Sequence, residues 1–385
     1  MDGWIAEGAQ RIAARAEHEL ERLVAVSSPS GDVTGAEEAF AVAASLAPAE
    51  ARAERSPCSS ADHAEDLVLT LAGSGRGRLL LLGHVDTVHS HRDHRAVERD
   101  GDRLIGSGTI DMKGGDVLAL GVLRELVRRS EDFAQVALLL VCDEEWRAGD
   151  FVHTQRFAGW DACLCFEGGD LTADGAEAVV VRRKAAGTLR VLAHGRSAHS
   201  GSAPDMGANA LLALAGAAQA VAACHDPAGP ANLTAVPTVL RSGEAFNVVP
   251  AAGELLCDLR ADELATFELV LDALPEIVDG VRLEGALLRR WPGMDSGELT
   301  AAMLDDASRR LGRPIVATAR GGASDASYMA PVIGVTIDGL GPLGGGAHTP
   351  HEHVLATSLR TRAEVALAIV DAVLTRGRPE GVQEL

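Results

Sequence analysis

The chain has 385 residues and a formal net charge of -20 at pH 7; 47% of its residues are hydrophobic and 3% are aromatic. Because this length exceeds what a single hydrophobic core usually serves, we expect two domains whose cores consist mainly of Ala, Leu and Val. The acidic balance, without any extended basic segment, argues against nucleic acid or an anionic membrane as a partner.

Residues 1–28 carry apolar side chains at helical spacing and lack the basic start, apolar stretch and cleavage site of an export signal. No apolar run approaches the roughly eighteen residues that a membrane span needs. The six cysteines show no disulfide or zinc-finger spacing, which is typical of a reducing compartment. We therefore expect an amphipathic opening helix and a cytoplasmic protein.

Apolar runs at residues 79–82, 136–142 and 162–166 alternate with helical patterns such as residues 117–127. This alternation predicts an α/β fold in which a mixed sheet is covered by helices.

A different pattern begins near residue 180, where an alternating segment precedes an Ala-rich helix expected at residues 205–223. Strand-like segments follow at residues 236–240 and 253–259. We therefore predict a smaller α+β domain inserted into a catalytic domain. The predicted limits are 1–183 and 292–385 for the two parts of the catalytic domain and 184–291 for the insertion. The second part should contain a helix, a strand and a closing helix, at residues 298–311, at residues 332–337 and up to residue 373.

Polar side chains follow the predicted strands of the first domain, where open α/β sheets bind their ligands. His84 and Asp86 follow the first run, Glu144 and Glu145 the second, and Glu167 the third. Taken singly, these are ordinary polar turns and solvated acidic surface. Asp111, in a glycine-rich stretch before a helix, would by itself be explained as a helix cap.

A glycine-rich loop near the C-terminus carries His348, His351 and His353. Alone, such a loop is equally well explained as a surface with adventitious metal affinity. Combined with the carboxylates, it completes a set of nitrogen and oxygen ligands that suits zinc or a related ion. Five ligands can hold two ions if one carboxylate bridges them. We therefore predict two divalent ions per chain, zinc in the first place and cobalt or manganese as alternatives.

The order and spacing of these motifs resemble the zinc exopeptidase family that includes glutamate carboxypeptidase, aminoacylase, acetylornithine deacetylase and succinyl-diaminopimelate desuccinylase. The resemblance covers nearly the whole chain. The matching segments are His84-Val85-Asp86-Thr87-Val88, Gly108-Thr109-Ile110-Asp111-Met112-Lys113-Gly114-Gly115, Asp143-Glu144-Glu145, Glu167, Gly195-Arg196-Ser197-Ala198-His199-Ser200, Asn247-Val248-Val249-Pro250, Asp258-Leu259-Arg260 and Ala347-His348.

The resemblance implies that His84 and Glu167 bind one ion, that Glu145 and His348 bind the other, and that Asp111 bridges them. His351 and His353 leave open which imidazole of the loop is the ligand, with His348 as the best match.

The resemblance also implies that Asp86 orients His84 and that Glu144 is the general base. The inserted domain would be the lid and dimerisation domain of a homodimer. In that dimer His199 of one copy would reach the substrate's carbonyl oxygen in the other.

Three residues are candidates for contact with substrate. Arg260 has the forked geometry that matches a carboxylate, although a surface salt bridge explains it equally well. Asn247 would assist, and Arg320, before a glycine loop, would recognise an anionic group. Residues 146–150 depart from the small residues that many family members have there, so we expect a reshaped pocket wall.

These features predict hydrolysis of an amide or peptide bond next to a free carboxylate, of the carboxypeptidase or N-acyl-amino-acid deacylase type. Glu144 would activate a water lying between the ions. Two alternatives stay open: a tailoring hydrolase that unmasks an amine on a biosynthetic intermediate or carrier, and a catalytically silent homologue that binds a peptide or amino acid. The complete ligand set argues against silence, since a binding protein needs no base beside its metals.

Overall fold

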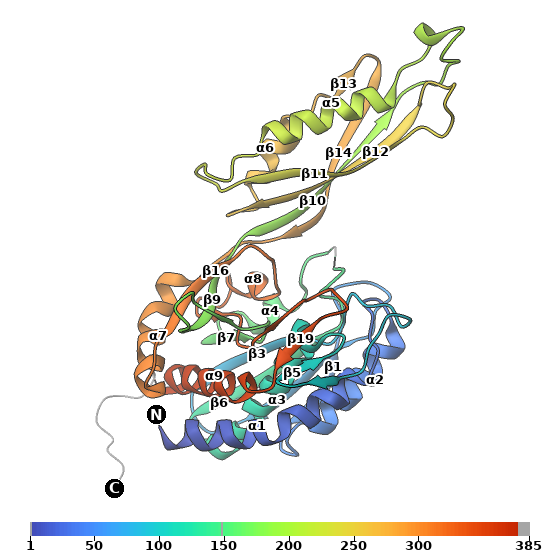
Figure 1. The fold of residues 1–385 in the computed structure, drawn as a ribbon. Coiled ribbons are helices and arrows are strands. Elements are labelled where there is room, and N and C mark those ends of the chain that lie inside the picture. The colour runs from blue at the N-terminus through green and yellow to red at the C-terminus, as the bar shows by residue number, and fades with distance from the viewer. Residues whose placement is uncertain (1, 148, 376–385) are drawn as a thin grey trace.

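The computed structural model describes residues 2–147 and 149–375. Figure 1 shows a larger lower body of sheets and helices and a smaller upper body. The chain enters the upper body at β10 (Ala185–His194) and leaves it at the end of β14 (Val281–Trp291). The upper body is therefore an insertion, and the predicted combination of an α/β domain with a smaller α+β domain is confirmed.

The lower body is built on a six-stranded mixed sheet with the order β1-β2-β6-β3-β7-β17. β2 runs antiparallel to β1 and β6, whereas β3, β6, β7 and β17 are parallel. The strands are β1 (Arg52–Ser56), β2 (Asp66–Ala72), β3 (Gly77–His84), β6 (Phe133–Val141), β7 (Ala162–Cys165) and β17 (Thr336–Ile337).

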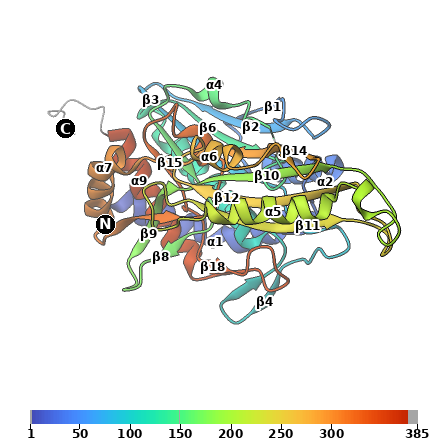
Figure 2. The same ribbon diagram turned by 90° about the horizontal axis from the view of Figure 1, so that it is seen from above.

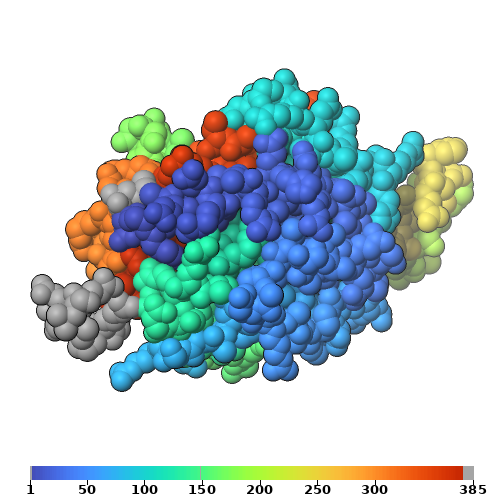
Figure 3. Space-filling model, turned by 90° about the horizontal axis from the view of Figure 1, so that it is seen from below, coloured from blue at the N-terminus to red at the C-terminus, as the bar shows by residue number. Residues whose placement is uncertain are grey.

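Both faces of this sheet are covered, which explains why its central strands are apolar throughout. Along β3, Leu79 and Leu81 belong to the larger core cluster, and Leu80 and Leu82 belong to a second cluster on the opposite face. The larger cluster is formed with α1 (Gly3–Val24), α2 (Val33–Leu46), α3 (Gly114–Leu126), α7 (Gly297–Leu311) and α9 (Ser358–Thr375). The second includes side chains of α4 (Thr154–Phe157) and α8 (Ala326–Met329). Seen from below, α1 and α2 cover much of the surface (Figure 3).

The upper body, called the lid below, is a five-stranded antiparallel sheet with the order β11-β12-β10-β14-β13. Its other strands are β11 (Thr234–Ser242), β12 (Ala252–Ala261) and β13 (Ile277–Val278). It also contains α5 (Ala210–Ala223) and α6 (Thr266–Asp272). Figure 2 shows α5 lying along the sheet. The lid has its own hydrophobic cluster, which includes Leu189, Leu214 and Phe267. The limits at residues 184 and 291 stay a prediction.

Two small sheets complete the lower body. One pairs β9 (Glu177–Arg183) with β8 (Asp170–Leu171), β15 (Met294–Asp295) and β16 (Ile315–Arg320). The other has the order β18-β19-β5-β4, with β18 (Gly344–Gly345), β19 (His353–Leu355), β5 (Arg103–Ile105) and β4 (Glu98–Asp100). The second sheet matters for function because the His348 loop joins β18 to β19.

Two elements are shorter than the sequence predicts. The helix expected from residue 205 begins at Ala210, because Pro204–Met206 form a separate 3₁₀ turn. The side chain of Asn209 caps the helix by accepting the N–H groups of Leu211 and Leu212. The strand expected at residues 332–337 covers only Thr336–Ile337, after a bend at Gly334. Across the described residues, no helix is both long and apolar enough to cross a membrane.

Candidate active site

Neighbouring central strands bring the acidic side chains to one edge of the sheet. His84 is the last residue of β3, Glu144 and Glu145 follow β6, and Glu167 follows β7. Because β6, β3 and β7 are adjacent and parallel, their carboxyl ends meet below the lid. Asp111 joins them from the irregular turn Thr109–Lys113 that precedes α3.

The predicted metal ligands form two groups that share Asp111. His84, Asp111 and Glu167 have ligand atoms within 4.8 Å of one another, and so do Asp111, Glu145 and His348. In the first group, Nε2 of His84 lies 3.1 Å from Oδ1 of Asp111 and 3.7 Å from Oε1 of Glu167. In the second, Nε2 of His348 lies 3.0 Å from Oδ2 of Asp111 and 3.2 Å from Oε2 of Glu145. The two oxygens of Asp111 thus face different imidazoles.

His348 reaches this position through an unusual backbone conformation. Its φ is 63°, in the left-handed region that residues other than glycine rarely adopt. Such conformations cluster at functional sites, where the surrounding structure imposes them. His351 and His353 share the loop with His348, but neither belongs to a group of potential metal ligands in the described part of the chain. The geometry therefore favours His348.

The carboxylates of the proposed metal ligands give the site an excess of negative charge. Burial raises the pKa values of Glu145 and Glu167 above their usual range, the latter strongly. Hydrogen bonds to Asp111 and Glu145 raise the pKa of His348 to about 10. Burial opposes protonation of His84, but hydrogen bonds to Asp111 and Asp86 raise its pKa well above the usual value. The site thus concentrates negative charge that divalent cations would neutralise.

The donor set fits such cations. It contains only imidazole nitrogens and carboxylate oxygens, which suit zinc and related ions. Oε1 of Glu145 is buried without a hydrogen-bond partner among the described residues, as expected for an oxygen whose partner would be a cation.

Asp86 connects the first imidazole to the acidic segment. Its Oδ1 lies 3.3 Å from Nδ1 of His84, the ring nitrogen that faces away from Asp111. The same carboxylate accepts the backbone N–H groups of Glu144 and Glu145, at 3.2 and 3.1 Å. Asp86 therefore holds the orientation of His84 and the start of the acidic segment together.

Glu352, which the sequence motifs did not single out, positions the Asp111 turn. Its carboxylate is 2% exposed and accepts the N–H groups of Gly108, Ile110 and Asp111, at 2.9 to 3.1 Å. Nε2 of His89 lies 3.1 Å from the same carboxylate. The only signal in the sequence is its place four residues after His348.

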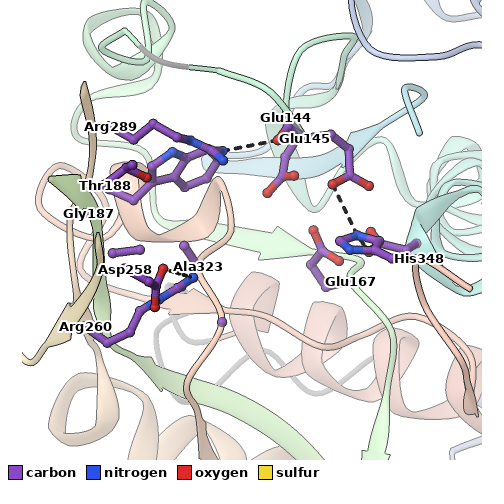
Figure 4. Close-up of a pocket in the computed structure, with 14 residues that line it drawn as sticks. Glu144, Glu145, Glu167, Gly187, Thr188, Asp258, Arg260, Arg289, Ala323 and His348 are labelled. Atoms are coloured by element: carbon purple, nitrogen blue, oxygen red, sulfur yellow. Dashed lines mark hydrogen bonds and ion pairs between the residues drawn. The ribbon is translucent and has the colours of Figure 1, made fainter. Parts of the chain in front are cut away.

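A cavity of about 280 Å³ lies between these residues and the lid. Its floor contains Glu144, Glu145, Glu167 and His348, which Figure 4 shows, and also Asp111. The facing wall comes from β10, β12 and β14 of the lid and contributes Gly187, Thr188, Asp258, Arg260, Arg289 and Trp291.

Two arginines of that wall bring positive charge to the cavity. Arg260 pairs with Asp258 at 3.1 Å and keeps 32% of its side chain exposed. Arg289 was not predicted; it donates to the backbone oxygens of Glu145 and Arg147, both at 3.2 Å.

The other candidate residues lie elsewhere. His199 and Asn247 are in the lid, outside the described residues that line the cavity, and Nδ1 of His199 accepts the N–H groups of Gly201 and Ser202 at 3.1 Å. Arg320 donates to the backbone oxygens of Gly168 and Gly169, at 2.8 and 3.1 Å. Its guanidinium is thus engaged by the segment that follows Glu167.

The segment after the acidic motif has a structural role. Arg147 is fully buried, pairs with Asp143 and Asp325, and its guanidinium carbon lies 4.6 Å from the centre of the Phe151 ring. Trp146 is 59% exposed and does not line the cavity. Arg147 therefore ties the acidic segment to the loop before α8.

Residues 80–372 match the Peptidase family M20/M25/M40. The chain belongs to this family. Carboxypeptidase G2 of Pseudomonas sp. (strain RS-16) is 26% identical to it over 372 residues, which cover 91% of this chain and 87% of that protein. Succinyl-diaminopimelate desuccinylase of Xylella fastidiosa (strain 9a5c) is 26% identical over 324 residues, or 78% of this chain and 85% of that protein.

Solved structures support the same fold. The crystal structure of aminopeptidase PepT from Bacillus cereus ATCC 10987 has a TM-score of 0.76 and 18% identity, and the match covers 94% of this chain and 98% of that one. The family resemblance inferred from the motifs is thus confirmed. As an M20 peptidase, the protein is a metal-dependent hydrolase that acts on C–N bonds.

Proposed function

We propose that this M20 hydrolase uses two divalent ions, zinc in the first place, to cleave an amide or peptide bond next to a free carboxylate. The observation that carries the proposal is the pair of ligand groups that share Asp111 below a cavity whose opposite wall carries Arg260 and Arg289. In this proposal His84 and Glu167 would hold one ion, Glu145 and His348 would hold the other, and Asp111, which belongs to both ligand groups, would be shared between them.

When bound, the ions supply positive charge beside the scissile carbonyl and make water more acidic. Glu144 is the general base: it takes a proton from the attacking water and passes it to the leaving amine. Burial, followed by the charges of neighbouring carboxylates, raises the pKa of Glu144 well above its usual value, which makes its carboxylate a stronger base toward the water. Asp86 keeps His84 and the backbone of Glu144 in position.

The substrate's carboxylate is assigned to the lid wall. Arg260 supplies a forked donor, and Arg289 adds a second positive charge close to the Glu145 backbone. A small N-acyl amino acid or short peptide fits a cavity of about 280 Å³. Arg320 is better suited to positioning the segment after Glu167 than to binding substrate.

His199 and Asn247 could contact the substrate only in a homodimer. Both lie on the lid: the backbone of His199 pairs with that of Val248, and Asn247 stands between the exposed residues Phe246 and Val248. Neither lines the cavity of its own chain in the described structure. In a dimer formed through the lids, His199 of one copy would donate to the substrate's carbonyl oxygen in the other copy.

A matched pair of substrates tests the proposal. Dipeptides and N-acetyl amino acids should be hydrolysed, and the same compounds with a carboxamide in place of the free carboxylate should be poor substrates. Activity should disappear with chelator and return with zinc, cobalt or manganese. Substitution of Arg260 by Gln should reduce the preference for the free acid mainly through KM. Equal turnover of the acid and the carboxamide would show that the enzyme does not recognise a free carboxylate. If no compound of the set is hydrolysed, the result would favour a binding function.

A further inference from the structure

A second cluster of potential metal ligands lies away from the active-site cavity. It consists of Cys58, Asp66 and Cys142, whose ligand atoms all lie within 4.8 Å of one another. No motif in the sequence joins these residues, and the proposed catalytic chemistry uses none of them.

The sheet brings the three residues together. Asp66 is the first residue of β2, and Cys142 directly follows β6. Because β2 pairs antiparallel to both β1 and β6, the start of β2 lies beside the ends of those two strands. Cys58 follows β1 by two residues and therefore arrives at the same place.

The cluster is a buried and partly organised site. Asp66 is 0% and Cys142 is 2% exposed, whereas Cys58 is half-buried and offers a route from solvent. The Asp66 carboxylate is oriented from two sides: Oδ1 accepts the N–H of Cys142 at 3.1 Å, and Oδ2 lies 2.7 Å from Nε2 of His153. Metal-binding carboxylates are commonly oriented by such hydrogen bonds.

We propose that Cys58, Cys142 and Asp66 bind a thiophilic divalent cation, such as zinc, at a site separate from the catalytic centre. Two thiolate sulfurs and one carboxylate oxygen form a softer set than the imidazoles and carboxylates of the cavity. Sulfurs that share one tetrahedral zinc lie about 3.8 Å apart, so small side-chain rotations are sufficient. Binding releases the two thiol protons to solvent, and water completes the coordination.

A cation bound by Cys58, Asp66 and Cys142 would be held in part by a residue that is close in the sequence to the active-site residues. Cys142 directly precedes Asp143, Glu144 and Glu145. A cation there would fix the end of β6 from which the acidic segment departs. It would also join β1, β2 and β6 at their adjacent ends.

Cobalt(II) added to reduced, metal-free protein tests the proposal, because only thiolate ligands give intense near-ultraviolet charge-transfer absorption. The unmodified protein should develop this band, and the Cys58→Ser and Cys142→Ser variants should lose it. Cys224→Ser is the matched control, since Cys224 is also half-buried but lies in the lid. It should keep the band.

His348→Ala should also keep the band, because the cavity contains no sulfur ligand. The test thus stays independent of the catalytic proposal. Absence of the band from unmodified, reduced protein would overturn the inference. So would a band that survives in Cys58→Ser, and the partly exposed position of Cys58 allows that variant to fold.

Discussion

At the scale of single residues, the site separates groups that bind cations from a group that moves a proton. Glu144 and Glu145 are neighbours in the chain, yet of the two only Glu145 forms an ion pair with an imidazole in the described part of the chain, with Oε2 at 3.2 Å from Nε2 of His348. Glu144 lines the same cavity and belongs to neither group of potential ligands in the described structure. This difference supports the proposal that Glu144 is the base, which the family resemblance implied.

Substitution of Glu144 by Gln should therefore leave the metal content unchanged and should not lower the melting temperature. A positioned general base typically accelerates a reaction by about 10²- to 10⁴-fold, so kcat should fall by about 10²-fold or more. Metal analysis and steady-state kinetics on the same preparation check this. Near-normal turnover would exclude Glu144 as the base.

A buried carboxyl near the site predicts a pH dependence of stability. Asp116, in the first turn of α3, is 0% exposed, and neither oxygen has a hydrogen-bond partner among the described residues. Burial raises the pKa of Asp116 to about 8. A raised folded-state pKa adds stability that is complete below the unfolded pKa and is lost as pH rises through the folded value.

The free energy of unfolding should accordingly fall with pH by about 1.4 kcal/mol per unit between pH 5 and 7 because of Asp116. The Asp116→Asn variant lacks this titration, so its stability should decline less steeply over the same interval. Urea unfolding of both proteins at several pH values gives the two slopes. Identical slopes would show that Asp116 is ionised in the folded state.

At the scale of elements, the short sheet β18-β19-β5-β4 supports the metal ligands from outside the central sheet. The β18–β19 loop carries His348, and Glu352 at its end accepts three N–H groups of the turn that contains Asp111. One loop therefore controls the position of two proposed ligands.

Truncation of Glu352 to Ala should release the Asp111 turn. Each buried N–H left without an acceptor costs about 1–3 kcal/mol, so we expect a loss of several kcal/mol together with weaker metal retention. Glu352→Gln keeps one acceptor oxygen and should be intermediate in both properties. The exposed Glu298 provides a control, because Glu298→Ala should change neither property appreciably. Full metal content and stability in Glu352→Ala would contradict this role.

Much of this element-scale organisation is predictable from sequence. His84, Glu145 and Glu167 follow apolar runs, and the ends of neighbouring parallel strands must meet. Asp111 and His348 lie on irregular segments, so the spacing of residues alone did not pair them, and the family resemblance was needed. Neither the strand pattern nor the family resemblance predicts the role of Glu352 or the cluster of Cys58 with Cys142. Their contacts join segments that are distant in the sequence, and these contacts depend on how the sheets pack.

At the scale of the whole molecule, the lid presents apolar side chains along one edge. Leu212 of α5 is 64% exposed, and Val236 and Leu240 of β11 are 42% and 40% exposed. β11 is also an edge strand, with unpaired backbone groups that can pair with another chain. This edge is the one we expect to form the homodimer.

Introduction of a charge there should separate the two copies. Leu212→Glu is expected to be monomeric in sedimentation experiments and, if His199 acts across the dimer, to lose most of its kcat while keeping its metal ions. Leu269→Glu is the matched control, because Leu269 is 63% exposed but lies on α6. A fully active monomer would contradict the proposed role of His199.

The sharing of Asp111 between two ions is the central claim, and metal content per chain tests it most directly. Elemental analysis should compare untagged protein, dialysed against trace zinc, with the His348→Ala and Asp111→Asn variants, all in a Cys58→Ser background so that the proposed thiolate site does not contribute. We predict about two ions in the parent protein, one or fewer in His348→Ala, and a loss of both in Asp111→Asn. A parent protein that holds a single ion, or an Asp111→Asn variant that retains two, would contradict the shared carboxylate.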